Sequence, residues 1–214
     1  VVQTFMRLDG QNAIVVLDAE GARARAAQAD AALARGEVWG PLHGVPMTIK
    51  ESHDRVGMPS TWGFPERRDS IATQDSVAVQ RLERAGAVIF GKTNVPVALA
   101  DFQSYNEIYG TTRNPWDTKR VPGGSSGGAA AAIAAGLTGL ELGSDIGGSI
   151  RNPSHYCGVF GHKPTWGLLS PRGHDLGALR PIDIAVIGPI ARSAADLELV
   201  VRALAGPDEL DAAG

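Results

Sequence analysis

Apolar residues recur along this chain in two patterns, one with the spacing of helices and one with that of short buried strands. Patterns that end at a glycine or begin at capping residues predict helices at 19–35, 73–85, 127–135 and 193–204. Short apolar runs predict strands at 13–17, 47–50, 87–90 and 137–142. Because helices and strands alternate, the pattern predicts an α/β fold.

Local signals mark the ends of several of these elements. Thr73 and Asp75 are candidate caps ahead of the second helix, and Ser193 opens a capping box at the start of the last one. We expect residues 1–8 to be the last turns of a helix whose start is absent. Scattered glycine and proline predict irregular structure over 168–181.

Composition narrows the class of protein. The chain has 214 residues, 43% of them apolar, which is enough for a real core and predicts a single domain over 1–214. Its net charge of −3 gives no electrostatic reason to expect a nucleic-acid or membrane partner. The longest uncharged, mainly apolar run, 129–137, is far too short to cross a membrane. The one cysteine, Cys157, excludes an internal disulfide and fits a reducing compartment, so we expect a cytoplasmic protein.

Glycine and serine are densest between Pro122 and Arg151. There, Gly-Gly-Ser-Ser-Gly-Gly and Asp-Ile-Gly-Gly-Ser-Ile-Arg flank an alanine-rich run. Glycine lets a backbone approach a ligand closely. A flexible linker is the alternative, but linkers are polar throughout, whereas 129–142 is almost wholly apolar. We therefore interpret the stretch as two loops that flank a helix and a strand.

Three groups near the ends of predicted elements are candidates for chemistry. Lys50 ends an apolar strand, where the alternative is an ordinary solvated strand end. Ser125 and Ser126 precede a helix, and Ser126 is also well placed to cap it. Ser149 lies in a Gly-Gly-Ser turn, whose consecutive N–H groups can converge on an anion as an oxyanion hole does.

Other motifs fit the chain less well. Gly-Ser-Ser-Gly-Gly formally matches a nucleophile elbow, with Ser126 as nucleophile and His155, His162 or His174 as its base. That elbow requires a preceding strand, and 119–122 is a poor one. No lysine follows the glycines as a phosphate-binding loop requires, and the histidines and the cysteine show no zinc-ligand pairs. We expect no metal and no cofactor.

These residues carry a resemblance to the amidase signature family. Residues 122–153 and 157–165 look like the signature of that family, and 40–50 resembles its upstream hallmark. Residues 91–94 and 188–189 extend the resemblance over nearly the whole chain. It implies a mixed β-sheet covered by α-helices on both faces. It also implies a longer chain, so we expect this one to be a fragment that is incomplete at its C-terminal side.

The resemblance further implies a Ser-cisSer-Lys triad. Lys50 would be the base, Ser125 the bridging serine held by a cis peptide bond, and Ser149 the nucleophile that becomes acylated. A serine hydroxyl attacks an amide only if a base takes its proton, and a lysine can be that base when burial lowers its pKa towards neutrality. Neutral Lys50 would then draw a proton through Ser125 and return it to the leaving amine.

Supporting groups are implied in the same way. Ser126 and Arg151 match supporting hydrogen-bond donors, although a surface role for Arg151 is the alternative. The oxyanion hole would be formed by the backbone N–H groups of Ile146, Gly147, Gly148 and Ser149. The acyl pocket has four aromatic candidates, for which plain core positions are the alternative: Trp62, Tyr105, Tyr109 and Trp166.

Family members hydrolyse varied amides or feed ammonia from glutamine to mischarged tRNA. The glutamine-using subunit typically carries an Asp in Ser-Leu-Asp-Gln-Ile-Gly-Pro, where this chain has Ala185. The departure favours a stand-alone amidase that cleaves a small-molecule amide to an acid plus ammonia or an amine, with a homodimer possible. Three alternatives stay open: a glutaminase or amidotransferase A-type subunit, a non-catalytic amidase-like binding subunit, and a hydrolase built on Ser126 and a histidine.

Overall fold

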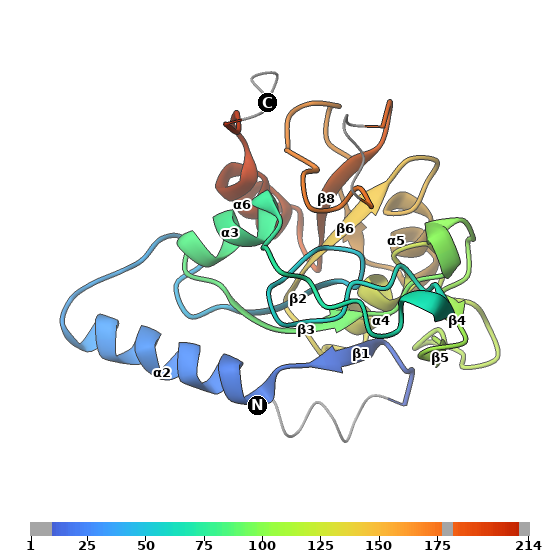
Figure 1. Ribbon diagram of the computed structural model, residues 1–214, viewed down its shortest axis with the longest axis horizontal. Coiled ribbons are helices and arrows are strands. Elements are labelled where there is room, and N and C mark those ends of the chain that lie inside the picture. Colours follow the sequence, from blue (N-terminus) through green and yellow to red (C-terminus); the bar gives the residue numbers. More distant parts are fainter. Residues whose placement is uncertain (1–9, 177–181, 210–214) are drawn as a thin grey trace.

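The computed structural model describes residues 10–176 and 182–209, within which the main feature is a mixed six-stranded sheet (Figure 1). The strand order is β1-β3-β2-β6-β8-β7, with β2 parallel to both of its neighbours and the outer pairs antiparallel. The strands are β1 (Ile14–Leu17), β2 (Pro46–Lys50), β3 (Val88–Thr93), β6 (Leu140–Asp145), β7 (Phe160–Gly161) and β8 (Val186–Ala191). A separate small hairpin pairs β4 (Tyr105–Asn106) with β5 (Gly110–Thr111).

Helices alternate with these strands, which confirms the predicted α/β class. Those described are α2 (Ala19–Ala34), α3 (Val77–Arg84), α4 (Gly127–Ala134), α5 (Arg151–Cys157) and α6 (Ala194–Leu204), with short 3-10 turns at Pro65–Arg67 and Val97–Leu99. Helix α2 extends beyond the edge of the sheet (Figure 1). The predicted box at the start of α6 is confirmed, because Ser193 accepts a hydrogen bond from the N–H of Asp196 at 3.2 Å.

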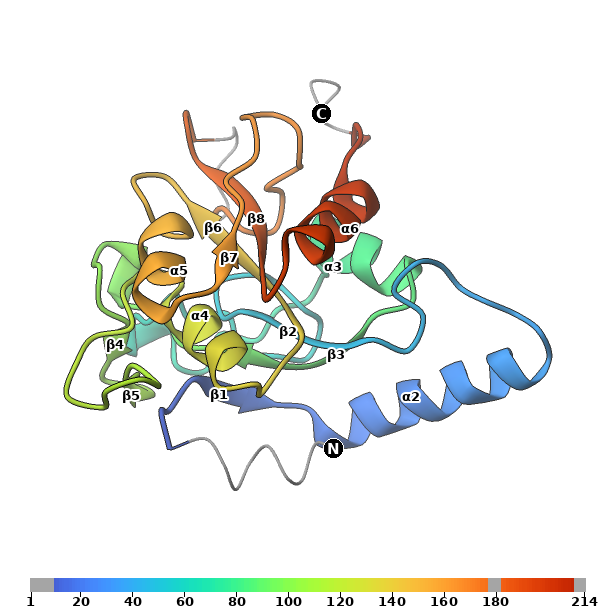
Figure 2. The same cartoon turned by 180° about the vertical axis from the view of Figure 1, so that it is seen from behind.

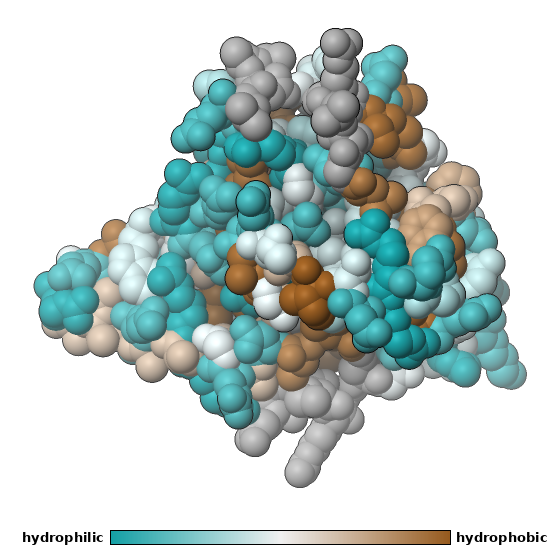
Figure 3. Space-filling model, viewed as in Figure 1, coloured by the Kyte–Doolittle hydropathy of each residue, from teal (hydrophilic) through white to brown (hydrophobic). Residues whose placement is uncertain are grey.

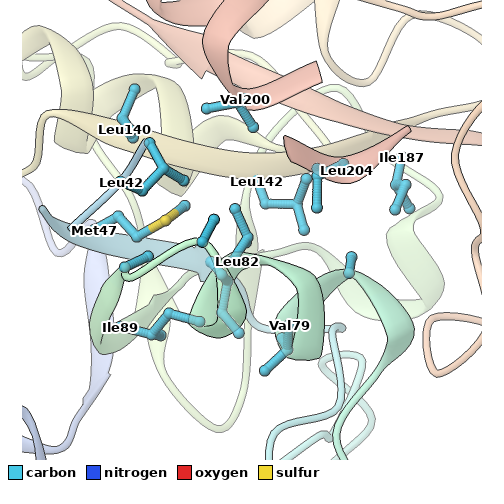
Figure 4. Close-up of a cluster of buried hydrophobic side chains, with 14 of the residues drawn as sticks. Leu42, Met47, Val79, Leu82, Ile89, Leu140, Leu142, Ile187, Val200 and Leu204 are labelled. Atoms are coloured by element: carbon cyan, nitrogen blue, oxygen red, sulfur yellow. The ribbon is translucent and has the colours of Figure 1, made fainter. Parts of the chain in front are cut away.

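Helices cover both faces of the sheet, as the resemblance implied. On one face α3 and α6 lie side by side, and their apolar side chains meet those of the central strands (Figure 4). The residues labelled there include Met47, Val79, Leu82, Ile89, Leu140, Leu142, Ile187, Val200 and Leu204. On the other face lie α4 and α5 (Figure 2). The glycines and alanines of α4 are small enough to let its backbone approach the strands closely.

Two predicted caps are wrong. Helix α3 begins after Ser76, whose hydroxyl accepts from the N–H of Val79, rather than after Thr73 or Asp75. The Asp75 carboxylate is already engaged by the N–H of Val56 at 2.7 Å, so it is not available as a cap.

The cap of α4 differs in the same way. The side chain of Ser126 forms no capping bond, and Ser104 Oγ accepts from the N–H of Gly127 at 2.9 Å instead. Strand β6 starts at Leu140, three positions after the predicted start, because Gly136, at φ 71°, turns the chain as it leaves α4. The helix predicted for residues 1–8 lies outside the described residues. The described part of 168–181 is irregular, as predicted.

The face of the molecule seen in the space-filling view is chemically mixed. Hydrophobic residues form small groups there among hydrophilic ones (Figure 3). Within 10–176 and 182–209, every helix is too short or too polar to traverse a bilayer.

Candidate active site

The neighbouring parallel strands β2 and β6 end at the same edge of the sheet, and the candidate site surrounds these two ends. Lys50 is the last residue of β2, and Asp145 is the last of β6. The loop after β6 carries Ser149. Ser125 lies just before α4, which packs against β2, β6 and β8. The fold thereby brings Lys50 to Ser125, 75 positions away in sequence.

Lys50 is fully buried, which overturns the alternative of a solvated strand end. Its Nζ donates to Ser125 Oγ at 2.6 Å and to Ser144 Oγ at 2.9 Å, and both acceptors are uncharged. Burial lowers the pKa of Lys50 to about 7, although the charges of Asp145 and Glu141 act in the opposite direction. A lysine with this pKa is partly neutral at pH 7 and can therefore accept a proton.

Ser125 and Ser149 line the same pocket. The Gly124–Ser125 peptide bond is cis, as the resemblance implied. The N–H of Ser126 donates to the carbonyl of Ser149 at 3.1 Å, which ties the two serine-bearing loops together. Within the described part of the chain, nothing hydrogen-bonds the hydroxyl of Ser149, so this group is open to the pocket.

Asp145 holds the loop that carries Ser149. Its carboxylate accepts from the N–H groups of Gly148 at 2.8 Å and Ile150 at 3.0 Å, and from Nε and a terminal nitrogen of Arg151, both at 3.0 Å. Burial alone would raise the pKa of Asp145, but the bonds from Arg151 and these N–H groups outweigh it and lower that pKa. Arg151 thus acts on the loop through Asp145, although its own side chain is half exposed.

This geometry corrects one member of the predicted oxyanion hole. The N–H of Gly148 points to Asp145 and is therefore not free to bind an oxyanion. The N–H groups of Ile146, Gly147 and Ser149 have no acceptor among the described residues, so three of the four predicted donors are free.

Ser126 is buried and bonds the backbone of Ser144, with its Oγ 3.3 Å from the carbonyl and 3.4 Å from the N–H. Across the described residues no histidine bonds this hydroxyl, and the ring of His174 bonds the carbonyl of Ser52 instead. In the same part of the chain, no strand lies directly before Ser126. The geometry of a Ser126–histidine hydrolase is therefore absent from the described chain.

The pocket next to Ser149 has about 680 Å³ of empty space, part of it open to solvent. Of the four aromatic candidates, only Trp62 lines it. Tyr109 instead donates to Glu51 at 3.3 Å, and Tyr105 and Trp166 are about half exposed elsewhere. The other apolar lining residues are Ala98, Leu99, Ile146, Pro171, Ile182, Ala185 and Val186.

A second buried ionisable group lies beside β2. Glu141 is fully buried, and its oxygens are hydrogen-bonded by the hydroxyls of Thr48 and Thr93. Burial raises the pKa of Glu141 to about 8, although those two hydroxyls and the charge of Lys50 act the other way. Glu141 is therefore largely protonated at neutral pH.

Sequence reasoning missed Ser144 and Asp145 as residues of the site, and it considered His174 only as a candidate base for Ser126. Asp145 stands six positions before Arg151 in the glycine-rich motif, so an acid–base pair across that loop was a readable signal. Ser144 and His174 carried no such signal, because each joins the site through a partner far away in sequence. The described residues contain no group of three His, Cys, Asp or Glu that could hold a metal ion.

Comparisons with known proteins agree with this arrangement. A family model named Amidase matches residues 6–213. The A-type subunit of glutamyl-tRNA(Gln) amidotransferase from Moorella thermoacetica is 44% identical over 212 residues, which are 99% of this chain and 43% of that protein. The chain thus spans less than half the length of this curated relative.

Solved structures give the same picture. The native peptide amidase of Stenotrophomonas maltophilia is 34% identical with a TM-score of 0.88, over 99% of this chain and 45% of that one. A chain of a vestigial protein complex, described as revealing the evolutionary origins of an s-triazine catabolic enzyme, is 43% identical with a TM-score of 0.90. The match covers 98% of this chain and 47% of that one. Sequence and fold thus agree with the motifs around Lys50 and Ser149, and the chain belongs to the amidase signature family.

Proposed function

We propose that this chain carries the catalytic centre of a serine amide hydrolase, with Ser149 as nucleophile, Ser125 as proton bridge and Lys50 as base. The observation that carries the proposal is the contact of 2.6 Å between buried Lys50 Nζ and Ser125 Oγ, in the pocket that Ser149 also lines. The lowered pKa of Lys50 supports it, because only a neutral amine can take up the proton of the nucleophile.

The proposed proton path uses the observed contact between Ser125 and Lys50, and it requires Ser149 Oγ to reach Ser125 Oγ across the pocket that both serines line. Ser149 Oγ attacks the carbonyl carbon of the amide while its proton passes to Ser125 Oγ, and the proton of Ser125 passes to Lys50 Nζ. When the C–N bond breaks, the proton returns through Ser125 to the leaving nitrogen, which departs as ammonia or an amine. Water then attacks the acyl-Ser149 ester by the same route and releases the acid.

The tetrahedral intermediate carries a negative oxygen that needs donors. The N–H groups of Ile146, Gly147 and Ser149 are the free donors of the loop, and Asp145 preorganises that loop through its bonds to the N–H groups of Gly148 and Ile150. One oxyanion donor of this kind typically stabilises the transition state by about 3 kcal/mol. Arg151 supports the donors indirectly, because it pairs with Asp145.

The test compares single variants on a panel of primary amides. Ser149→Ala, Ser125→Ala and Lys50→Ala should each lower kcat/KM by at least about a thousandfold, because members of such a unit fail together. Cys157→Ser, at a buried position outside the pocket, is the matched control and should keep most of the activity. Full activity in Lys50→Ala together with loss in Ser126→Ala would favour the serine–histidine alternative instead.

A second candidate is release of ammonia from glutamine as an amidotransferase A-type subunit, which the name of the Moorella relative favours. The pocket argues against it. Ala185 lines the pocket at the position where the glutamine-using subunits typically carry the Asp that binds the amino group of glutamine. Glutamine should therefore be a poor substrate, and Ala185→Asp should raise kcat/KM for glutamine relative to propionamide. Efficient glutamine hydrolysis by the unaltered chain would reverse this ranking.

Wider expectations about location, domain organisation and assembly belong to the same proposal. The cytoplasmic location and the homodimer remain predictions, as does a single domain over 1–214. A protein partner is consistent with the relatives, one of which is a subunit of an amidotransferase and one part of a complex. Sedimentation of the purified chain, alone and after mixing with candidate subunits, distinguishes a monomer, a dimer and a mixed complex.

A further inference from the structure

His174 lies in the wall of the pocket and takes no part in the proposed proton path. His174 is distant from β2 in sequence but lies next to the end of that strand. Its Nδ1 bonds the carbonyl of Ser52 at 3.1 Å, and Ser52 is two residues after Lys50. This contact brings the irregular segment around 171–175 against the end of the strand that carries the base.

The faces of the His174 ring are covered. It stacks on the ring of His53 at a centroid distance of 4.3 Å and on the ring of Trp62 at 4.9 Å, with interplanar angles of 26° and 23°. His53 is fully buried, so this stack is anchored in the protein on one side. The imidazole can therefore present only its edge to the pocket.

The hydrogen bond to Ser52 determines what that edge offers. A carbonyl oxygen only accepts, so Nδ1 of His174 must carry the hydrogen. In a neutral imidazole the other nitrogen, Nε2, is then an acceptor. Burial, followed by the charge of Lys50, lowers the pKa of His174 to about 3, so the ring is neutral at pH 7.

Nε2 has no protein partner among the described residues, and it is not enclosed by protein either, so it is accessible from the pocket. The other polar groups in the wall have assigned contacts or roles. Ser125 and Ser149 belong to the proposed reaction, and Ser144 Oγ accepts from Lys50. The Asp145 carboxylate is held by Arg151, and the Asp175 carboxylate accepts from the N–H of Gly173 at 3.3 Å. The rest of the wall is mainly apolar.

We propose that His174 determines substrate specificity by accepting a hydrogen bond through Nε2 from an N–H or O–H group on the acyl part of the amide. This rests on the proposed hydrolase function. In a primary amide the leaving group is ammonia, so the acyl group is the part large enough to occupy the pocket. The substrate class is thus an amide whose acyl group is apolar apart from one donor. An acyl group without a donor leaves Nε2 desolvated and unpaired, which lowers affinity.

The test measures binding to the Ser149→Ala protein, so that it does not depend on turnover. The probes are 4-hydroxyphenylacetamide and 4-aminophenylacetamide, which carry a donor, and 4-methoxyphenylacetamide, which does not. Calorimetry should give about tenfold tighter binding of at least one donor probe than of the methoxy probe. Adding His174→Phe keeps a flat ring for the stack but removes both nitrogens, and the ratio should fall to about one. His155→Phe, at an exposed position on α5, is the matched control and should keep the ratio.

A second measurement needs no change at His174. In ¹⁵N NMR of the Ser149→Ala protein, the Nε2 resonance of His174 should shift on addition of a donor probe and stay in place with the methoxy probe. The proposal would be overturned by equal affinities for the donor and methoxy probes, or by an affinity ratio that is unchanged in His174→Phe. It would also be overturned if no probe showed saturable binding. Failure of the proposed hydrolase function would be seen separately. In that case the Ser149→Ala protein would bind the probes with the expected ratio of affinities, but the unaltered protein would not hydrolyse them.

Discussion

Lys50 derives its chemical character from where β2 ends. Its stem continues a strand that is buried from Met47 onward, so the amine is removed from water and has two hydroxyls as partners rather than a carboxylate. An ammonium in such a place loses solvation without a direct ion pair to replace it. That balance lowers the pKa of Lys50 to about 7 and makes the neutral amine accessible at ordinary pH.

The pH dependence of hydrolysis follows with a definite sign. In the proposed mechanism the neutral amine is the base, so kcat/KM should rise with pH to a plateau, with an inflection near pH 7. Well below that pH the rate should fall about tenfold per unit, because the neutral fraction falls by that factor. Initial rates on one amide between pH 5 and 9 provide the measurement. A flat profile, or an inflection near 10, would exclude Lys50 with a lowered pKa as the base.

Residues within long motifs could be recognised from the sequence, whereas residues defined by tertiary contacts could not. Lys50, Ser125 and Ser149 each stand at a marked position in a glycine- or proline-bounded segment. Ser144 and His174 stand in equally visible segments, but their roles depend on Lys50 Nζ and Ser52 O, which reach them only through the fold. Gly148 is a motif residue that the sequence assigned wrongly. The motif predicts its N–H as an oxyanion donor, but in the fold this N–H bonds the carboxylate of Asp145.

At the scale of elements, α4 positions Ser125 by fitting closely against the strands. Its glycines and its alanines up to Ala132 are buried, and none of them has a bulky side chain to hold the helix away from β2 and β6. The apolar run predicted both α4 and β6 in the right order, although β6 starts at Leu140. The boundary was not predictable, because Ala135, Gly136 and Leu137 could continue either pattern until the turn at Gly136 is known.

Gly128→Ala tests this close fit. A Cβ at Gly128 would lie 2.4 Å from the backbone nitrogen of Asn94 and 2.9 Å from the carbonyl of Ala13, so α4 must move away from the sheet. We expect a loss of about 1–3 kcal/mol in the free energy of unfolding. The rate should fall as well, because Ser125 moves with the helix. Denaturant unfolding and amide hydrolysis are the two measurements.

Gly139→Ala is the matched control for that substitution. A Cβ at Gly139 meets nothing within 4 Å, so we expect stability and rate within a small margin of the unaltered protein. Equal behaviour of the two variants would show that α4 does not need its close approach.

At the scale of the whole molecule, the centre of the sheet contains ionisable groups on neighbouring strands. Lys50 on β2 and Glu141 on β6 are both fully buried. Alternation on β6 correctly indicates that Glu141 lies on the opposite face of the sheet from Leu140 and Leu142. The sequence alone does not show that α4 covers the Glu141 face and so buries this side chain. The mixed sheet, its two helical layers and a buried Lys50 were predictable from the family resemblance, and the burial of Glu141 was not.

Glu141→Gln should stabilise the protein in a pH-dependent way. The folded pKa of Glu141, about 8, lies above its ordinary value of 4.5, so unfolding releases a proton between those pH values and the unaltered protein loses stability as pH rises. Glutamine does not titrate and can still bond Thr48 and Thr93. The variant should match the unaltered protein near pH 5 and exceed it by about 4 kcal/mol at pH 8. Denaturant unfolding at both pH values measures this, and a constant difference would contradict it.

The most direct test of the central claim is the site at which a serine-directed fluorophosphonate reacts, located by peptide mass spectrometry. The account predicts one phosphonylated serine, Ser149, with labelling lost in Ser149→Ala and strongly slowed in Lys50→Ala. Modification of Ser126 instead would contradict the assignment of the nucleophile. A chain that is not labelled at all would indicate a non-catalytic binding subunit.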